Sequence, residues 1–299
     1  MKKLISILDL SIDEIDKIFS IADIEKKLYQ QYNNALEGKM LGNFFFQPST
    51  RTQFSLQAAF MKLGGKVISC SDINQTRSGP PYFEPLDDMG HIVSSYCDIV
   101  AMRTINDMNT KLFVREMTVP FISAGSGNIE HPTQALVDLF SIKKYYKQIN
   151  NNNILIIGTP RQRTINSFIL GLSRYKNINV HILSQSGVYL MDEVFSKCSS
   201  INIAYYSSWE ELISANILSS ISIVYVDKIF NETKEYNYFI IQKDYLELMN
   251  KDVLILHPLP RTKELPKHID VMPGAYYYRQ AELGMYVRSA LFLYFMNII

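Results

Sequence analysis

Residues 43–52, with the sequence NFFFQPSTRT, join a run of apolar side chains to a turn rich in hydroxyl groups. The apolar run predicts a buried strand, and Phe54, Ala58 and Met61 recur at the spacing of a helix that ends at Gly64-Gly65. The N-terminus of a helix offers unpaired N–H groups and a partial positive charge. Four polar side chains stand at this helix start, namely Ser49, Thr50, Arg51 and Thr52. Backbone and side-chain donors together predict a site for a phosphate or a carboxylate.

A simpler interpretation of Ser49 and Thr50 is an ordinary helix cap, because serine and threonine are favoured at that position. Arg51 stands between two hydroxyl residues directly after the apolar strand, which favours the anion site.

The length and composition indicate the number of domains and the classes of partner to expect. The chain has 299 residues, enough for two domains, and its 47% apolar and 20% charged residues are typical of a soluble globular protein. The formal net charge of +1 gives no reason to expect nucleic acid or a membrane surface as a partner. An anionic substrate must therefore be bound by local positive charge.

The cysteines and the N-terminus indicate a cytoplasmic protein. Cys70, Cys97 and Cys198 are odd in number and have neither metal-ligand nor redox spacing, which fits a reducing compartment. The N-terminal segment turns polar by Asp9 and lacks a signal-peptide core. No apolar run approaches the roughly 20 residues that span a bilayer. We therefore expect a soluble, cytoplasmic protein.

Strand and helix signals alternate along the chain. Residues 11–14 form a capping box that opens a helix, and a longer helix is predicted to begin at His131. Further strands are predicted at residues 66–70, 98–103, 119–124, 154–157, 180–183, 201–205, 221–226 and 253–256. The alternation predicts an α/β fold of two doubly wound parallel-sheet domains joined by long helices. We expect domains at residues 1–130 and 131–280, with a C-terminal helix of about residues 281–299 packing back on the first.

The second series of strands and helices does not carry a nucleotide-binding signature. Residues 154–158, ILIIG, resemble the strand and first glycine of a dinucleotide-binding unit. Residues 159–163, TPRQR, contain none of the further glycines that let a pyrophosphate approach the backbone. The glycine–lysine signature of an NTPase phosphate loop is also missing from the sequence. We therefore exclude both nucleotide interpretations.

Cations and hydrogen-bond donors gather at the predicted carboxyl ends of the strands, where parallel sheets bind their ligands. The set comprises Ser49 to Thr52, Arg103, His131 and Gln134 in the first half, and Arg163, Lys228 and residues 257–261 in the second. Taken singly, Arg103 and Arg163 are compatible with solvated surface charges, and His131 with a helix cap or a core histidine. The set is nearly free of carboxylates. It therefore predicts a site that binds anions and stabilises negative charge, rather than one that uses paired acids.

Several motifs resemble the aspartate/ornithine carbamoyltransferase family, and most closely its aspartate carbamoyltransferase catalytic chains. The segments that carry the resemblance are residues 45–52 with 63–65, 131–140, 257–261 and 284–288. Thr133 and Pro258 stand where the ornithine-type members usually have cysteine. The resemblance runs in order along essentially the whole chain.

The resemblance implies transfer of the carbamoyl group of carbamoyl phosphate to the amine of L-aspartate. The products would be N-carbamoyl-L-aspartate, for pyrimidine biosynthesis, and phosphate. Residues 1–130 would bind carbamoyl phosphate and residues 131–280 the amino acid acceptor. The implied carbamoyl phosphate ligands are Ser49, Thr50, Arg51, Thr52, Arg103, His131, Gln134 and the backbone carbonyls of Leu259 and Pro260. Four of these would be catalytic, namely Arg51, Thr52, Arg103 and His131. Arg163 and Lys228 would bind the acceptor.

The resemblance also implies how the protein assembles. Family members form trimers whose active sites are shared across subunits, so we expect a homotrimer. A regulatory subunit is compatible with the resemblance. The resemblance implies no metal and no cofactor.

The sequence departs from the family pattern on the acceptor side. Tyr82 stands four residues after Ser78, where a lysine from the neighbouring subunit is usual, and Arg77 is a nearby substitute. Lys228, Phe230 and Thr233 match the positions of the family's Arg-x-Gln-x-x-Arg. Gln47 replaces a glutamate that pairs with arginine across the domains. The carbamoyl phosphate half is therefore intact, and the half that selects the nucleophile is altered.

These observations leave three functional hypotheses. The first is an aspartate carbamoyltransferase. The second is a diverged carbamoyltransferase for another amine with fewer carboxylates, which Phe230 and Tyr82 favour. The third is a catalytically weak family member with an assembly or regulatory role. The complete donor sets at residues 49–52 and 131–134 argue against the third hypothesis.

Overall fold

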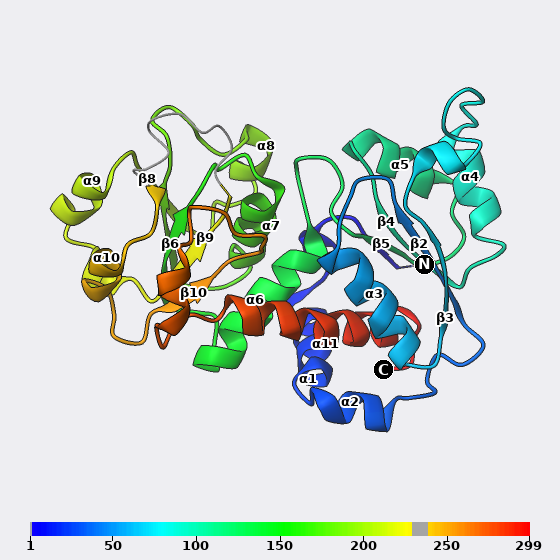
Figure 1. Cartoon of the computed structure of the whole chain (residues 1–299), viewed down its shortest axis with the longest axis horizontal. Helices are drawn as coiled ribbons and strands as arrows, with labels where there is room; N and C mark the ends of the chain where they lie inside the picture. The colour runs from blue at the N-terminus through cyan, green and yellow to red at the C-terminus, as the bar shows by residue number, and fades with distance from the viewer. Residues whose placement is uncertain (1, 229–238) are drawn as a thin grey trace. The chain divides into compact units, whose positions relative to one another are not determined.

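The computed structural model describes residues 2–228 and 239–299 (Figure 1). Phe230 and Thr233, two of the departures from the family pattern, lie outside the described residues. The chain forms two compact units. The first unit comprises Met1–Val137 and Glu282–Ile299, and the second comprises Asp138–Ala281. We describe each unit by itself.

The first unit contains a five-stranded parallel sheet with the order β1-β5-β4-β2-β3. Its strands are β1 (Lys3–Leu4), β2 (Met40–Phe45), β3 (Lys66–Cys70), β4 (Ile99–Arg103) and β5 (Phe121–Ser123). The chain passes from β2 outward to β3 and then returns to the opposite side of β2 as β4. The strand order therefore reverses between β2 and β4. Open α/β sheets bind ligands beyond the carboxyl ends of the strands at such a switch point.

Helices connect these strands. The first unit contains α1 (Ile12–Ala22), α2 (Lys26–Gln31), α3 (Arg51–Lys62), α4 (Leu86–Val93) and α5 (Asp107–Arg115). The predicted capping box is present at α1, because the Ser11 side chain accepts from the Glu14 N–H and the Glu14 carboxylate accepts from the Ser11 N–H. Two longer helices, α6 (Pro132–Tyr146) and α11 (Tyr277–Phe295), each contain residues of both units. The last helix begins at Tyr277 rather than near residue 281.

The structure shows which of the apolar side chains of α3 are buried. Phe54 and Met61, which share the predicted apolar spacing, are 59% and 61% exposed. The buried side chains are instead those of Leu56, Ala59 and Phe60. The Phe60 ring meets Phe292 of α11 edge to face, with ring centroids 5.0 Å apart. Because both faces of α3 carry apolar residues, the periodicity predicts the helix but does not identify its packed side.

The second unit contains another five-stranded parallel sheet, with the order β10-β9-β6-β7-β8. Its strands are β6 (Asn152–Ile157), β7 (Ile178–Leu183), β8 (Asn202–Tyr206), β9 (Ile223–Val226) and β10 (Leu254–Leu256). Its helices are α7 (Arg163–Leu172), α8 (Asp192–Phe195), α9 (Trp209–Ser214) and α10 (Lys243–Glu247). The strand order reverses between β6 and β9, so this unit has a switch point of the same kind.

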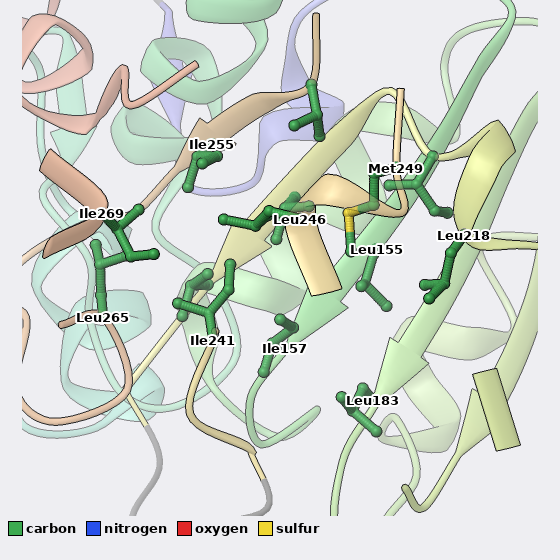
Figure 2. Close-up of a cluster of buried hydrophobic side chains, with 14 of the residues drawn as sticks. Leu155, Ile157, Leu183, Leu218, Ile241, Leu246, Met249, Ile255, Leu265 and Ile269 are labelled. Carbon is green, nitrogen blue, oxygen red and sulfur yellow. The ribbon is translucent and has the colours of Figure 1, made fainter. Parts of the chain in front are cut away.

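The central strands of the second unit are apolar on both faces. On one face, Leu155 and Ile157 of β6 belong to a buried cluster that includes Leu246 of α10 (Figure 2). On the other face, Phe168 of α7 stacks on Tyr225 of β9 with ring centroids 4.5 Å apart. Strands covered on both faces require nearly continuous apolar sequence, as these strands have. The two parallel sheets confirm the predicted α/β class.

Candidate active site

The junction between β2 and α3 presents polar side chains without a hydrogen-bond partner among the described residues. Thr50 occupies the N-cap position of α3, but its side chain makes no capping hydrogen bond. Across residues 2–228 and 239–299, no hydrogen-bond partner is found for the side chains of Ser49, Thr50 and Arg51. The structure therefore does not support the helix-cap interpretation. The hydroxyl and guanidinium donors stand free beside the N-terminus of a 12-residue helix.

Arg103 is the last residue of β4, and its side chain is hydrogen-bonded to Gln47. The Phe46 N–H donates to the Arg103 carbonyl at 2.9 Å, and the Arg103 Nε donates to Gln47 Oε1 at 3.0 Å. Gln47 is the residue that replaces the family's glutamate, and here its neutral amide orients the guanidinium without cancelling its charge. The other N–H groups of Arg103 have no partner in the described parts of the chain. Arg103 is thus positioned and still able to bind an anion.

His131 lies immediately before α6 and is buried, with 4% of its surface exposed. Thr52 Oγ1 lies 3.4 Å from its Nε2, and Thr133 Oγ1 lies 3.3 Å from its Nδ1. The ring packs on Gly125, which has a φ of +90°, and a Cβ atom at that position would lie 2.7 Å from the ring. Sequence at this turn is therefore restricted to glycine by both backbone conformation and space.

Burial and a nearby cation keep His131 uncharged. Burial lowers the pKa of His131 to about 3, and the positive charge of Arg288 acts in the same direction. Arg288 is itself buried on α11, one turn after Gly284, where a Cβ atom would lie 2.5 Å from Nη1. The sequence motif at residues 284–288 contributed to the resemblance but suggested no role for Arg288. The glycine four residues before an arginine on one helix face was the available signal.

The segments that carry these residues are bonded to one another. The Thr104 N–H donates to Ser126 Oγ at 3.1 Å, and the Gly127 N–H donates to the Thr104 carbonyl at 3.3 Å. Gln134 lies in the first turn of α6, where its N–H donates to the His131 carbonyl at 2.9 Å. The predicted residues of the first unit therefore gather beyond the carboxyl ends of β2, β4 and β5. This is the switch point of the first sheet.

The predicted acceptor ligands lie at the other switch point, beyond β6 and β9. Arg163 is the first residue of α7, and Lys228 follows β9. Burial lowers the pKa of the Arg163 guanidinium, and the negative charge of Asp227 acts against this shift. Asp227 is 5% exposed, and its carboxylate accepts from the Thr164 hydroxyl and, at 2.6 Å, from the Lys228 N–H. Burial raises the pKa of Asp227.

Buried carboxylates that the predicted set does not include lie in the second unit. Asp227 lies directly beside the acceptor ligands, and Glu264 and Asp138 are fully buried in the same unit. Asp227 could have been found from the sequence, because it immediately precedes Lys228 at a predicted strand end. Asp138 and Glu264 carry no local signal of this kind.

Residues 257–261 follow β10 and divide into two parts. The Leu259 N–H donates to His257 Nδ1 at 2.7 Å, and the Leu259 backbone has a φ of 57°. Arg261 points elsewhere: Asp270 Oδ2 accepts from its Nη2 at 2.8 Å, and the Tyr278 hydroxyl lies 3.0 Å from the same atom. Arg261 is therefore engaged in a structural ion pair. The Pro260 residue between them is exposed.

The loop that contains Ser78 shows one altered acceptor position directly. The Arg77 guanidinium lies over the Tyr82 ring, 4.2 Å from its centroid, and Tyr82 is 62% exposed. Ser78 is buried, with Oγ 3.4 Å from Met89 Sδ.

Within the described residues, no group of three or more His, Cys, Asp or Glu side chains could hold a metal ion. No described helix is long and apolar enough to cross a membrane.

Comparison with known proteins shows which family these features belong to. The family model for the aspartate/ornithine carbamoyltransferase carbamoyl-P binding domain matches residues 2–144, and the model for the Asp/Orn binding domain matches residues 150–295. The aspartate carbamoyltransferase catalytic subunit of Clostridium botulinum is 34% identical, covering 100% of this chain and 99% of the relative. The catalytic subunit of Picrophilus torridus is 37% identical, covering 96% of this chain and 95% of the relative.

A solved structure gives the same result. The catalytic subunit of M. jannaschii aspartate transcarbamoylase matches with a TM-score of 0.87 at 30% identity, covering 100% of this chain and 99% of that one. Both family models, the full-length relatives and the solved structure agree with the resemblance that the motifs indicated. The chain belongs to the aspartate/ornithine carbamoyltransferase family.

Proposed function

We propose that this chain transfers the carbamoyl group of carbamoyl phosphate to the amine of L-aspartate. The products are N-carbamoyl-L-aspartate and phosphate. The observation that carries the proposal is the cluster of free donors at residues 49–51, beside Arg103 and an uncharged His131. Relatives named as aspartate carbamoyltransferase catalytic subunits that align over nearly their whole length support it.

The phosphate group of carbamoyl phosphate binds at the start of α3. Ser49, Thr50 and Thr52 donate hydrogen bonds, and the helix N–H groups add further donors. Arg51 and Arg103 supply the positive charge that a protein with a net charge of only +1 must provide locally. The phosphate-binding role of each of these residues is part of the proposal and follows the family motif.

The chemical step builds negative charge on the carbamoyl oxygen. The amine attacks the carbonyl carbon, a C–N bond forms, and the C–O bond to phosphate breaks with its electron pair leaving on phosphate. A phosphate oxygen takes the proton that the amine loses. Thr52, His131 and Arg103 donate hydrogen bonds to the carbamoyl oxygen as its charge develops. His131 Nδ1 lies 3.3 Å from the Thr133 hydroxyl, and in the tautomer with the proton on Nε2 the ring can donate to the carbamoyl oxygen from that atom.

The remaining groups orient the two reactants. Gln134 holds the amide end of the carbamoyl group, and the backbone carbonyls of Leu259 and Pro260 accept hydrogen bonds from the carbamoyl NH2 or the incoming amine. Arg163 and Lys228 bind the carboxylates of aspartate. Lys228 binds as a point charge, whereas the planar guanidinium of Arg163 can bind a carboxylate through two parallel hydrogen bonds.

A second candidate is a carbamoyltransferase for an amine with fewer carboxylates. The buried Asp227 favours it, because a carboxylate beside Arg163 reduces the net positive charge available to a dicarboxylate acceptor. Tyr82, stacked under Arg77, adds no positive charge where the family has lysine. A catalytically weak assembly or regulatory role is disfavoured by the free donors of α3.

The test is to supply the purified protein with carbamoyl phosphate and a panel of amines, reading phosphate release and ureido product. Turnover of aspartate with a KM between about 1 μM and 1 mM, the usual range for enzymes, supports the first candidate. Turnover of another amine with aspartate inert establishes the second. Tight binding of carbamoyl phosphate without turnover of any amine leaves the regulatory role.

We further propose a cytoplasmic homotrimer with shared active sites, to which a regulatory subunit can bind. The exposed Phe54 and Met61 of α3 give the first unit apolar surface that a neighbouring subunit would cover. Light scattering during gel filtration measures the mass: about three times 34.5 kDa supports the trimer, and a monomer contradicts it. Mixing an inactive variant of the Ser78 loop with an inactive variant at Arg51 tests sharing, because activity returns in mixed trimers only if one subunit supplies the loop to its neighbour's site.

A further inference from the structure

A chain of buried polar side chains in the second unit links two helices to the segment that carries Leu259. Gln280 of α11 donates through Nε2 to Asp138 Oδ1 of α6 at 2.5 Å. The His257 N–H donates to Gln280 Oε1 at 2.9 Å. His257 Nε2 lies 3.0 Å from Glu264 Oε1. The side chains of Asp138, Gln280, His257 and Glu264 are all buried, with at most 1% of each residue exposed.

The hydrogen bonds of His257 fix both the tautomer and the orientation of its ring. The Leu259 N–H donates to Nδ1 at 2.7 Å, so Nδ1 is the acceptor and carries no proton. The ring proton is therefore on Nε2, which donates to Glu264. Both ring nitrogens are used inside the segment that runs from β10 to Glu264. The ring in turn holds Leu259 in the left-handed backbone region, at a φ of 57°.

Buried polar networks of this kind cost free energy unless every member is bonded. Each hydrogen bond described above satisfies one such group, and the Tyr225 hydroxyl adds another by donating to Asp138 Oδ2 at 3.1 Å. The network leads from the helices α6 and α11 to Leu259.

We propose that Gln280, anchored by Asp138, is a positioning residue that aims the Leu259 and Pro260 carbonyls at the carbamoyl group. The proposal rests on the proposed function, because that function assigns the two carbonyls their role. Gln280 is suited to it because an amide both donates and accepts. Its NH2 group bonds the Asp138 carboxylate, and its oxygen accepts from the His257 N–H.

The first experiment compares Gln280→Met with the control Tyr225→Phe. Both variants remove one buried hydrogen bond to Asp138, but only Gln280 also bonds His257. We expect Gln280→Met to lower kcat by about 100-fold, the effect of a misplacement of about 1 Å, with the Kd of carbamoyl phosphate changed less than about threefold. Tyr225→Phe keeps kcat within about twofold. Equal losses of kcat in both variants, or an unchanged kcat in Gln280→Met, overturn the proposal.

The second experiment reverses the donor and acceptor at one bond. Gln280→Glu alone sets a carboxylate against Asp138 and should lower kcat as Gln280→Met does. Adding Asp138→Asn restores the bond, because the asparagine NH2 then donates to the new glutamate, whose other oxygen still accepts from the His257 N–H. We expect the double variant to recover kcat to within about fivefold of the unmodified protein. A folded double variant without recovery overturns the proposal.

A readout without turnover separates this proposal from the proposed function. The Leu259 amide should exchange its proton slowly in the unmodified protein because it is bonded to His257. We expect exchange at Leu259 to be at least about tenfold faster in Gln280→Met and unchanged in Tyr225→Phe. Protein that turns over no amine but shows this pattern refutes the proposed function and leaves the positioning of Leu259 intact. Unchanged exchange in Gln280→Met refutes the positioning itself.

Discussion

The buried, uncharged His131 predicts a specific dependence of stability on pH. The folded pKa of His131 is about 3, below its ordinary value of 6.5. When the pH falls below 6.5, the unfolded chain binds a proton at this residue and the folded chain does not, so the folded state loses stability. At pH 5, which is about one and a half units below the ordinary value, the loss amounts to about 2 kcal/mol. At pH 8 it is close to zero.

The matched variant is His131→Gln, whose side chain is neutral at every pH in this range. The free energy of unfolding is measured by urea titration at pH 8 and pH 5 for both proteins. Contributions of the other histidines cancel in the difference between the two proteins. We expect the stability of the unmodified protein relative to His131→Gln to fall by about 2 kcal/mol between pH 8 and pH 5. A difference independent of pH would refute the burial argument, because His131 would then titrate as an exposed histidine.

Further predictions concern three positions around the sites. Gln47→Glu should raise the KM for carbamoyl phosphate about tenfold, because a carboxylate partner would cancel the charge of Arg103, and an unchanged KM would show that the neutral amide is not needed. Asp227→Asn should lower the KM for aspartate about three- to tenfold with no change for carbamoyl phosphate, and a higher KM would show that this carboxylate helps to bind the acceptor. Gly125→Ala should lower kcat about 100-fold by pushing on the His131 ring, and retained activity would show that the ring position is uncritical.

The fold could be predicted from the sequence because its strands are covered on both faces. Continuous apolar runs such as residues 154–157 mark the central strands of each sheet. The elements missed were short or polar. Strand β1 has two residues, too few for any periodicity, and α5 at Asp107–Arg115 has a largely polar surface. The buried side of α3 could not be predicted either, because it depends on packing against α11, a helix more than 200 residues later in the sequence.

Some residues of the candidate site could likewise be predicted from local sequence, whereas others depend on partners that are distant in the sequence. Residues 49–52 and Arg103 stand at strand ends, so one rule about parallel sheets predicts that they gather. Arg288, Asp138 and Gln280 act through partners far away in the sequence, and helical sequence around them suggests only packing. Gln47 was recognised as a departure from the family, but its bond to the Arg103 guanidinium required the structure.

The central claim is that the start of α3 binds the phosphate of carbamoyl phosphate for transfer to aspartate. The most direct measurement is the rate at which the purified protein forms N-carbamoyl-L-aspartate, compared between the unmodified chain and Arg51→Ala. Lys62→Ala, which removes an exposed cation from the other end of α3, is the control for overall charge. We predict product formation by the unmodified chain and by Lys62→Ala, and a loss of kcat/KM of at least about 1,000-fold in Arg51→Ala. Near-normal kcat/KM in Arg51→Ala would contradict the account.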